Sequence, residues 1–240
     1  MGSLKEPWDA VRARITQAAQ SCARAPDDIR LLAVSKTFGV DAIREVAGYG
    51  QRDFGENYIQ EAVEKIQLLR TDPVTQHCVW HCIGPIQSNK TRWVAEHFDW
   101  VHSIDRLKIA QRLSEQRPAH LPPLQVLLQV NTSGEDSKNG LSVADEAGLL
   151  ALAREVSALP RLRLRGLMAL PAPEADDAAQ RAAHHRLRAL FDRLVAAGLP
   201  LDTLSMGMSG DLEAAIAEGS TLVRVGTAIF GGRTRPAPEA

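Results

Sequence analysis

Short apolar runs alternate with helix-like segments along this chain, and that alternation restricts its fold more than any other feature of the sequence. Eight runs predict strands, while most of the segments between them place apolar residues three or four positions apart, as amphipathic helices do. The connections are too long for hairpins, so we expect parallel strands. The predicted strands lie within residues 30–37, 53–57, 77–83, 100–104, 124–130, 164–170, 203–206 and 221–225.

This pattern predicts an α/β fold, a single (β/α)8 TIM barrel that forms one domain over residues 1–240. Residues 8–22 form an amphipathic pattern before the first strand, which predicts an extra N-terminal helix. An open doubly wound sheet is the alternative, but its glycine-rich fingerprint should follow the first strand, and Gly48-Tyr49-Gly50 follows a helix instead. Residues 232–240 are expected to be a frayed tail.

Capping residues predict where two of the helices begin. Asp105 stands at an N-cap position before the apolar face that starts at Leu107. The segment Ser142-Val143-Ala144-Asp145 resembles a capping box that would open the helix ending near Pro160.

The charge balance argues against a polyanionic partner. Lys and Arg number 28 against 29 Asp and Glu, a formal net charge of -1, and no block of five or six like charges occurs. A nucleic acid or an anionic membrane is therefore not predicted as a partner. The apolar runs are too short to span a bilayer, and the first residues have no apolar signal core. We expect a soluble cytoplasmic protein.

The three cysteines, Cys22, Cys78 and Cys82, are an odd number, which suits a reducing compartment better than a disulfide framework. The segment His77–Cys82 could suggest zinc. In a strand, however, its two cysteines would share one face and its two histidines the other, and no second ligand pair follows. The cysteines are interpreted as core residues, and no metal site is predicted.

Lys36 is the first candidate for chemistry. It follows the apolar run Leu31-Leu32-Ala33-Val34 and would lie at the carboxyl edge of a buried parallel strand, where ligands of α/β proteins bind. Apolar walls would lower the pKa of this amine and leave a fraction able to attack an aldehyde. Most lysines at strand ends are solvated surface charges, so this segment alone does not decide between the two readings.

Two loops have the composition of a phosphate site. Residues 206–211 place two glycines and the hydroxyl of Ser209 directly before a predicted helix, where free amides and the helix dipole favour an anion. Arg224-Val225-Gly226-Thr227 repeats that arrangement after the last strand. The loops after the seventh and eighth strands are the usual phosphate site of such barrels, although glycines also serve simply to make tight turns.

Several segments in order along nearly the whole chain resemble the signature segments of the pyridoxal phosphate homeostasis protein family. That resemblance implies a single barrel of the alanine racemase N-terminal type that binds pyridoxal 5′-phosphate as an internal aldimine. The matching segments are Ala33–Thr37, Phe54–Tyr58, His81–Lys90, Gly166–Ala169, Leu204–Ser209 and Val223–Gly231.

The resemblance also implies roles for single residues. Lys36 would be the Schiff-base lysine, Asn57 would line the cofactor, and Arg224 would face the pyridine nitrogen. A guanidinium has only donors, so it cannot stabilise a protonated pyridine as a carboxylate would. The phosphate would bind to Ser209, Gly226 and Thr227.

Two positions need separate mention. Phe38 stands where some family members carry a second lysine, which puts any secondary aldimine or transfer role there in doubt. Lys138 matches a lysine of the family's mobile loop, although a lysine in so polar a segment could equally be a surface charge.

The resemblance implies a monomeric, non-catalytic protein that stores, buffers or delivers pyridoxal phosphate, with apo-enzymes that need this cofactor as possible recipients. An amino-acid racemase is the alternative, but racemisation usually needs a tyrosine from a second domain, and this chain has only Tyr49 and Tyr58. A lysine aldolase without a cofactor is a third class, which the resemblance disfavours.

Overall fold

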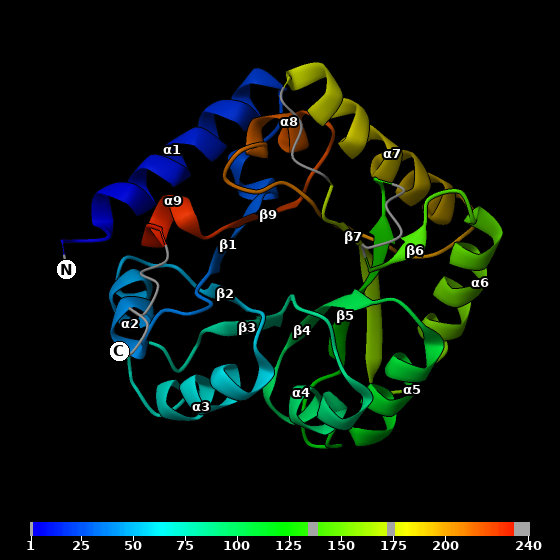
Figure 1. The fold of residues 1–240 in the computed structure, drawn as a ribbon, viewed down its shortest axis with the longest axis horizontal. Helices are drawn as coiled ribbons and strands as arrows, with labels where there is room; N and C mark the ends of the chain where they lie inside the picture. Colours follow the sequence, from blue (N-terminus) through cyan, green and yellow to red (C-terminus); the bar gives the residue numbers. More distant parts are fainter. Residues whose placement is uncertain (1, 134–138, 172–175, 233–240) are drawn as a thin grey trace, which may run out of the picture.

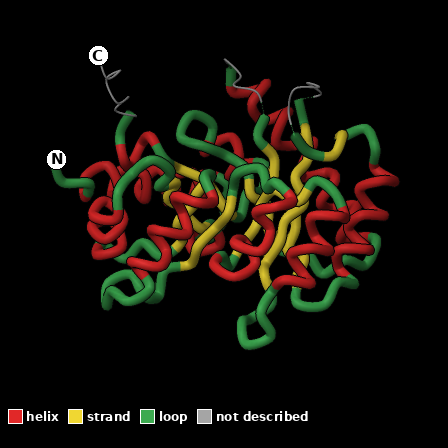
Figure 2. The backbone as a smooth tube through the Cα atoms, turned by 60° about the horizontal axis from the view of Figure 1, so that its bottom comes forward, coloured by secondary structure: helices red, strands yellow, loops and turns green. Residues whose placement is uncertain are grey.

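The computed structural model is a closed barrel of eight parallel strands, as the alternation of strand and helix patterns predicted, and it describes residues 2–133, 139–171 and 176–232. The ring closes where β9 pairs with β1, with Arg30 opposite Leu222. Helices surround the strands (Figures 1 and 2). The barrel strands in spatial order are β1 (Arg30–Val34), β2 (Asp53–Glu56), β3 (Val79–Cys82), β4 (Trp100–Ile104), β5 (Leu124–Asn131), β7 (Leu162–Ala169), β8 (Thr203–Ser205) and β9 (Leu222–Val225).

Helices follow most of the strands, and their apolar faces pack against the outside of the barrel. None of the helices in the described ranges is long and apolar enough to cross a membrane. They are α1 (Lys5–Ser21), α2 (Val40–Gly48), α3 (Ile59–Leu69), α4 (Thr91–His97), α5 (Leu107–Gln116), α6 (Glu146–Ser157), α7 (Asp177–Ala196), α8 (Leu212–Ala217) and α9 (Thr227–Phe230), with 3-10 turns at Pro26–Asp28 and Ser88–Lys90.

The extra N-terminal helix lies against the last part of the chain. In Figure 1, α1 runs along the outside of α8 and α9. Val11 and Ile15 of this helix are buried in the main core, and the guanidinium of Arg24, just after the helix, donates to the carbonyl of Ile216 in α8 at 2.8 Å. The helix is therefore attached to the side of the barrel that carries the final two strands.

The interior of the barrel contains a small apolar cluster and several buried polar side chains. Trp100, Leu127 and Met168 pack together inside the ring. The guanidinium groups of Arg30 and Arg165 lie 4.6 and 5.0 Å from the Trp100 ring centroid, which favours cation–π attraction. Further along the interior, the buried side chains are polar: His81, His102, Ser205 and Arg224.

Both predicted helix caps are wrong. Asp105 accepts a hydrogen bond from its neighbour Arg106, and α5 begins after Arg106 without a side-chain cap. Ser142 belongs to a two-residue strand, β6 (Leu141–Ser142), which pairs with the end of β5. With Ser142 in this pairing, the helix begins later, at Glu146, and its N-cap is Asp145, whose carboxylate accepts from the Gly148 N–H at 2.9 Å.

The third strand is shorter than predicted. Cys78 donates its N–H to the carbonyl of Thr75 in a turn, so the strand begins only at Val79. The sixth predicted strand begins two residues earlier than expected, at Leu162, because β7 pairs with β5 from Leu124 onward. The predicted frayed tail falls almost entirely on residues outside the described ranges.

Candidate functional site

One cavity of about 340 Å³ opens at the carboxyl ends of the barrel strands. Parallel strands bring the loops that follow them to one end, so residues far apart in sequence meet there. Loops after six of the strands contribute to the walls. The lining residues are Val34, Lys36, Thr37, Phe38, Asn57, Ile83, Leu170, Met208, Ser209, Gly210, Arg224, Gly226, Thr227 and Gly231.

Lys36 sits two residues beyond β1, half-buried in a tightly held loop. Thr37 has a φ of 68°, a left-handed conformation that costs a non-glycine residue about 1–2 kcal/mol. Its N–H donates to the carboxylate of Glu61 at 3.0 Å, and the ring of Phe38 stacks on Phe230 with centroids 5.0 Å apart. These contacts fix the direction in which the loop presents the lysine.

A buried ion cluster supports that loop from below. Glu56, at the end of β2, is fully buried and accepts from the Ser35 hydroxyl at 2.6 Å and the Lys65 amine at 3.1 Å. Lys65 comes from α3 and also pairs with Glu61 at 2.5 Å and donates to the Ser35 carbonyl. Burial raises the pKa of Glu56, and the Lys65 ammonium partly opposes that rise.

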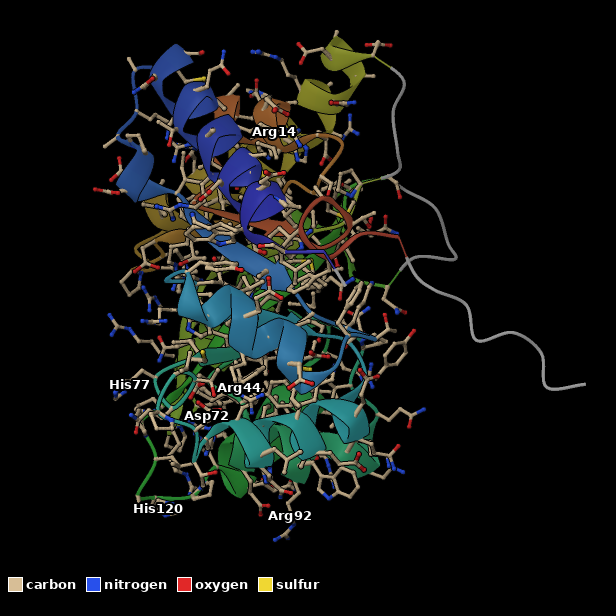
Figure 3. All side chains as sticks on the ribbon, turned by 90° about the vertical axis from the view of Figure 1, so that its left-hand side faces the viewer. Arg14, Arg44, Asp72, His77, Arg92 and His120 are labelled. Carbon is tan, nitrogen blue, oxygen red and sulfur yellow. The ribbon has the colours of Figure 1, made fainter. Side chains whose placement is uncertain are left out.

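The loop between β8 and α8 is held by Asp211 from inside and by Arg14 from outside. Asp211 accepts from the Met208 N–H at 2.6 Å and is bonded to His184 at 3.0 Å. Burial pushes the pKa of Asp211 upward, but the bonds from His184 and Met208 outweigh it and keep that pKa below its usual value. Arg14, on α1 where it passes α8 (Figure 3), donates to the Ser209 carbonyl at 3.0 Å and pairs with Glu213.

The loop after β9 lies against β1. A Cβ on Gly226 would meet the Val34 carbonyl oxygen at 3.1 Å, so the glycine allows the two loops to approach. Thr227 begins α9 and is exposed at the cavity mouth. The first N–H groups of a helix have no partner within the helix, so this turn presents donors beside the Thr227 hydroxyl.

Asn57 is placed by a similar close approach. A Cβ on Gly84, in the loop after β3, would lie 2.5 Å from the Asn57 carbonyl oxygen, which only a glycine permits. Asn57, which follows β2, is thereby held against the loop after β3 and is one of the residues that line the cavity.

Arg224 is buried at the base of the cavity. Its Nη1 donates to the Ser205 hydroxyl at 2.6 Å and its Nη2 to the Ala169 carbonyl at 2.8 Å. Burial lowers the pKa of this guanidinium to about 10, so it stays cationic at neutral pH. The side chain offers a fixed positive charge and only donors to a ligand.

All six residues singled out in the sequence line this one cavity, which places Lys36, Asn57, Ser209, Arg224, Gly226 and Thr227 together. Phe38 is also a lining residue, whereas Lys138 lies outside the described residues. Sequence reasoning missed the apolar wall of Ile83 and Leu170, and it missed the supporting pairs that Lys65 and Arg14 form. The strand-end positions of Ile83 and Leu170 could have signalled that wall.

The segment considered for zinc does not come together as a metal site. His77 lies at the periphery, in the turn before β3 (Figure 3). Burial raises the pKa of the Cys78 thiol to about 11 and that of Cys82 to about 12, which disfavours the thiolates that a metal needs. Within the described ranges, no group of three or more His, Cys, Asp or Glu residues is arranged to hold a metal.

Known proteins resemble this chain in sequence and in fold. The family model described as alanine racemase, N-terminal domain, matches residues 8–234. A pyridoxal phosphate homeostasis protein from Pseudomonas aeruginosa is 60% identical over 240 residues, 100% of each chain. The structure of PipY from Synechococcus elongatus with PLP bound has a TM-score of 0.76 and 37% identity, and the match covers 90% of this chain and 100% of PipY.

A more distant likeness shows the fold alone. Alanine racemase from Clostridium difficile is 17% identical with a TM-score of 0.70, and the match covers 98% of this chain but 58% of the racemase.

The buried ion cluster generates a prediction on stability. Lys65→Met should lower the free energy of unfolding by about 3–5 kcal/mol at pH 8, because it leaves the Glu56 carboxylate buried without its cation. A raised folded-state pKa for an acid means that stability is lost as pH rises from the unfolded value toward the folded one, so the deficit should shrink toward pH 5. Urea unfolding at both pH values measures this.

The matched variant adds Glu56→Gln to Lys65→Met, which removes the unpaired charge and leaves an amide that can bond Ser35. We expect the double variant to be more stable than Lys65→Met at pH 8. Equal stability of the two, or a deficit independent of pH, would show that the cluster is not a coupled ion pair.

Proposed function

Because the chain belongs to the pyridoxal phosphate homeostasis protein family, we propose that it binds pyridoxal 5′-phosphate in the strand-end cavity and holds it for release to other proteins. The observation that carries the proposal is the meeting of Lys36 with two donor-rich loops in a single cavity. The cavity volume is within the range of small-molecule sites. A pyridoxal phosphate molecule offers an aldehyde for an amine, a phosphate for donors and a ring nitrogen that accepts.

The phosphate end is assigned to the loops after β8 and β9. Ser209, Gly226 and Thr227 all line the cavity, and the two strands that their loops follow, β8 and β9, are paired neighbours. The first turn of α9 adds N–H donors, which suit a doubly charged phosphate. We do not assign Asp211 to the phosphate site, because its carboxylate is already hydrogen-bonded to His184 and to the Met208 N–H.

The ring end is assigned to Arg224 and Asn57, and the aldehyde to the Lys36 amine. Bound pyridoxal phosphate supplies electron withdrawal only as far as its ring nitrogen carries positive charge. Arg224 remains cationic and can only donate, so it cannot accept a hydrogen bond from a protonated ring nitrogen and favours the neutral ring. This arrangement supports a role in holding the cofactor rather than in catalysis with it.

An open mouth supports exchange with other proteins. Lys36 is only half-buried and Thr227 is exposed, so a recipient could approach the covalent attachment point and the phosphate end. The recipients are apo-enzymes that require pyridoxal phosphate. We place the protein in the cytoplasm as a monomer with one binding domain; its three free cysteines suit a reducing compartment.

The racemase alternative is supported by a likeness of fold, but not by the geometry of the cavity. Tyr58 follows Asn57 but is 50% exposed and does not line the cavity. The racemase likeness covers 58% of that enzyme, so the rest of the enzyme has no matched counterpart here. An acid on the face opposite Lys36 is what a racemase would require.

The covalent attachment can be tested by substitution of the lysine. Lys36→Ala should remove the borohydride-sensitive visible absorption band that pyridoxal phosphate gives with the wild-type protein, while the barrel stays folded because no core cavity opens. Peptide mass analysis after reduction should locate the adduct at Lys36 in the wild type. The control Lys108→Ala, on the exposed face of α5, should keep the band. A band that persists in Lys36→Ala would reject this assignment.

The phosphate assignment predicts a loss of affinity. Ser209→Ala combined with Thr227→Ala should weaken cofactor binding by about tenfold or more for each hydroxyl, since a hydrogen bond to a charged group contributes about 1.5–3 kcal/mol. Equilibrium titration measures the dissociation constants. Ser21→Ala combined with Thr71→Ala removes two exposed hydroxyls away from the cavity and should leave affinity unchanged. Unchanged affinity in the first pair would move the phosphate elsewhere.

The non-catalytic reading predicts slow proton exchange. The loaded protein should exchange the α-hydrogen of free L- or D-alanine no faster than pyridoxal phosphate alone, to within about tenfold, or roughly 1.4 kcal/mol in barrier height. NMR in deuterated water follows the exchange. An acceleration of several orders of magnitude that Tyr58→Phe abolishes would establish the racemase alternative and make Tyr58 its acid.

A further inference from the structure

A continuous line of hydrogen-bonded side chains runs through the barrel from the cavity to the opposite end. Arg224 Nη1 donates to Ser205 Oγ at 2.6 Å, and Ser205 Oγ lies 2.9 Å from His102 Nδ1. His102 Nε2 lies 2.9 Å from His81 Nδ1, and His81 Nε2 lies 2.9 Å from Asp53 Oδ1. We call these five residues the buried relay; Asp53 begins β2 at the amino end of the barrel, whereas Arg224 lines the cavity.

The two ends of the relay carry opposite charges. Burial pushes the pKa of Asp53 upward, but the bond from His81 and the charge of Arg30, 3.5 Å away, keep that pKa below its usual value. Asp53 is therefore a carboxylate at neutral pH, and it can only accept. Arg224 is a guanidinium, and it can only donate.

The two imidazoles between them are neutral. Burial lowers the pKa of His81 despite the neighbouring carboxylates of Asp53 and Asp99. Burial also lowers the pKa of His102 well below its usual value, and the nearby charges of Arg224 and Arg30 act in the same direction. Each ring therefore has one donor nitrogen and one acceptor nitrogen.

These conditions determine every proton in the line. The Asp53 carboxylate requires an N–H at His81 Nε2, so His81 Nδ1 accepts from His102 Nε2–H. His102 Nδ1 then accepts the Ser205 hydroxyl proton, which leaves the Ser205 oxygen to accept from Arg224. The carboxylate end imposes this direction, and the guanidinium end is compatible with it, because a hydroxyl oxygen can accept from Arg224 while its own proton is donated to His102.

We propose that Asp53, His81, His102 and Ser205 are positioning residues that fix the guanidinium of Arg224 at the ring side of the cofactor cavity, from the far end of the barrel. This inference rests on the proposed function, because it assigns a role to residues that never touch the ligand. The Ala169 carbonyl holds one nitrogen of the guanidinium, and the relay holds the other. Two fixed nitrogens define the plane of the group, whereas one would leave it free to turn.

The proton pattern can be tested without the cofactor. Long-range ¹H–¹⁵N NMR of the ligand-free protein at pH 7 should show His81 and His102 both neutral and both protonated at Nε2. A proton on Nδ1 of His102, or an imidazolium at either position, would overturn the relay. The result of this NMR measurement does not depend on whether the protein binds pyridoxal phosphate. A failure of the proposed function would be detected by a different experiment, as the absence of the visible absorption band.

The positioning role is tested with the loaded protein and a matched pair of variants. Asp53→Asn keeps the shape of the terminal acceptor but removes its charge, so the direction of the line is no longer imposed. Asp202→Asn is the control: Asp202 precedes β8 at the same end of the barrel and bonds to Arg165 and Thr203, and none of its hydrogen bonds among the described residues reaches the buried relay. Both variants are first shown to be folded by urea unfolding.

We expect Asp53→Asn to shift the visible band of bound pyridoxal phosphate and to speed its release roughly three- to tenfold, the effect of one weakened hydrogen bond. Asp202→Asn should change neither quantity. If the folded Asp53→Asn protein matched the wild type in both, or if the two variants changed them equally, the positioning role would be rejected. If Asp53→Asn did not fold, the tautomers of the wild-type protein would decide the proposal.

Discussion

Pairing between β9 and β1 is the interaction on which the site depends. It joins the last strand to the first, with Leu32 opposite Arg224 and Ala33 opposite Val225. That register brings the Lys36 loop beside Gly226, whose missing side chain lets the two backbones approach. A shift by one residue would turn the Arg224 side chain from the interior to the helix side of the sheet. The register therefore determines the relative positions of the amine, the phosphate loops and the guanidinium.

Buried charge is the second constraint, and the barrel meets it in two ways. Glu56 and Lys65 neutralise each other directly under the lysine loop. Arg224 has no carboxylate in contact among the bonds described; its guanidinium is held by Ser205 and the Ala169 carbonyl, and the charge of Asp211 opposes the fall in its pKa. A charge removed from water without such partners would be strongly destabilising. The polar interior thus requires connected side chains, and the connections orient the site.

The sequence predicted the parts of the molecule that local patterns specify. Apolar runs such as Leu124–Val130 located the strands, and the glycine and hydroxyl loops located the cavity wall. The sequence did not predict features that depend on contacts between residues far apart in the chain. Ser142 pairs within β6 instead of starting a helix, and Arg14 bonds to Ser209 from nearly 200 positions away. The buried relay was also missed, because His81 and His102 gave no signal of contact without the register of β3 against β4.

Closure of the sheet also bears on how the protein survives without its ligand. In a ring, the backbone groups of the eight strands are paired with neighbours, so emptying the cavity uncovers no strand edge that another chain could extend. The short β6 adds only two residues beside β5, too little for intermolecular pairing. A protein that alternates between full and empty would meet crowded conditions in both states. Whether or not the cavity is filled, the closed ring leaves no barrel strand edge open to pairing with another chain.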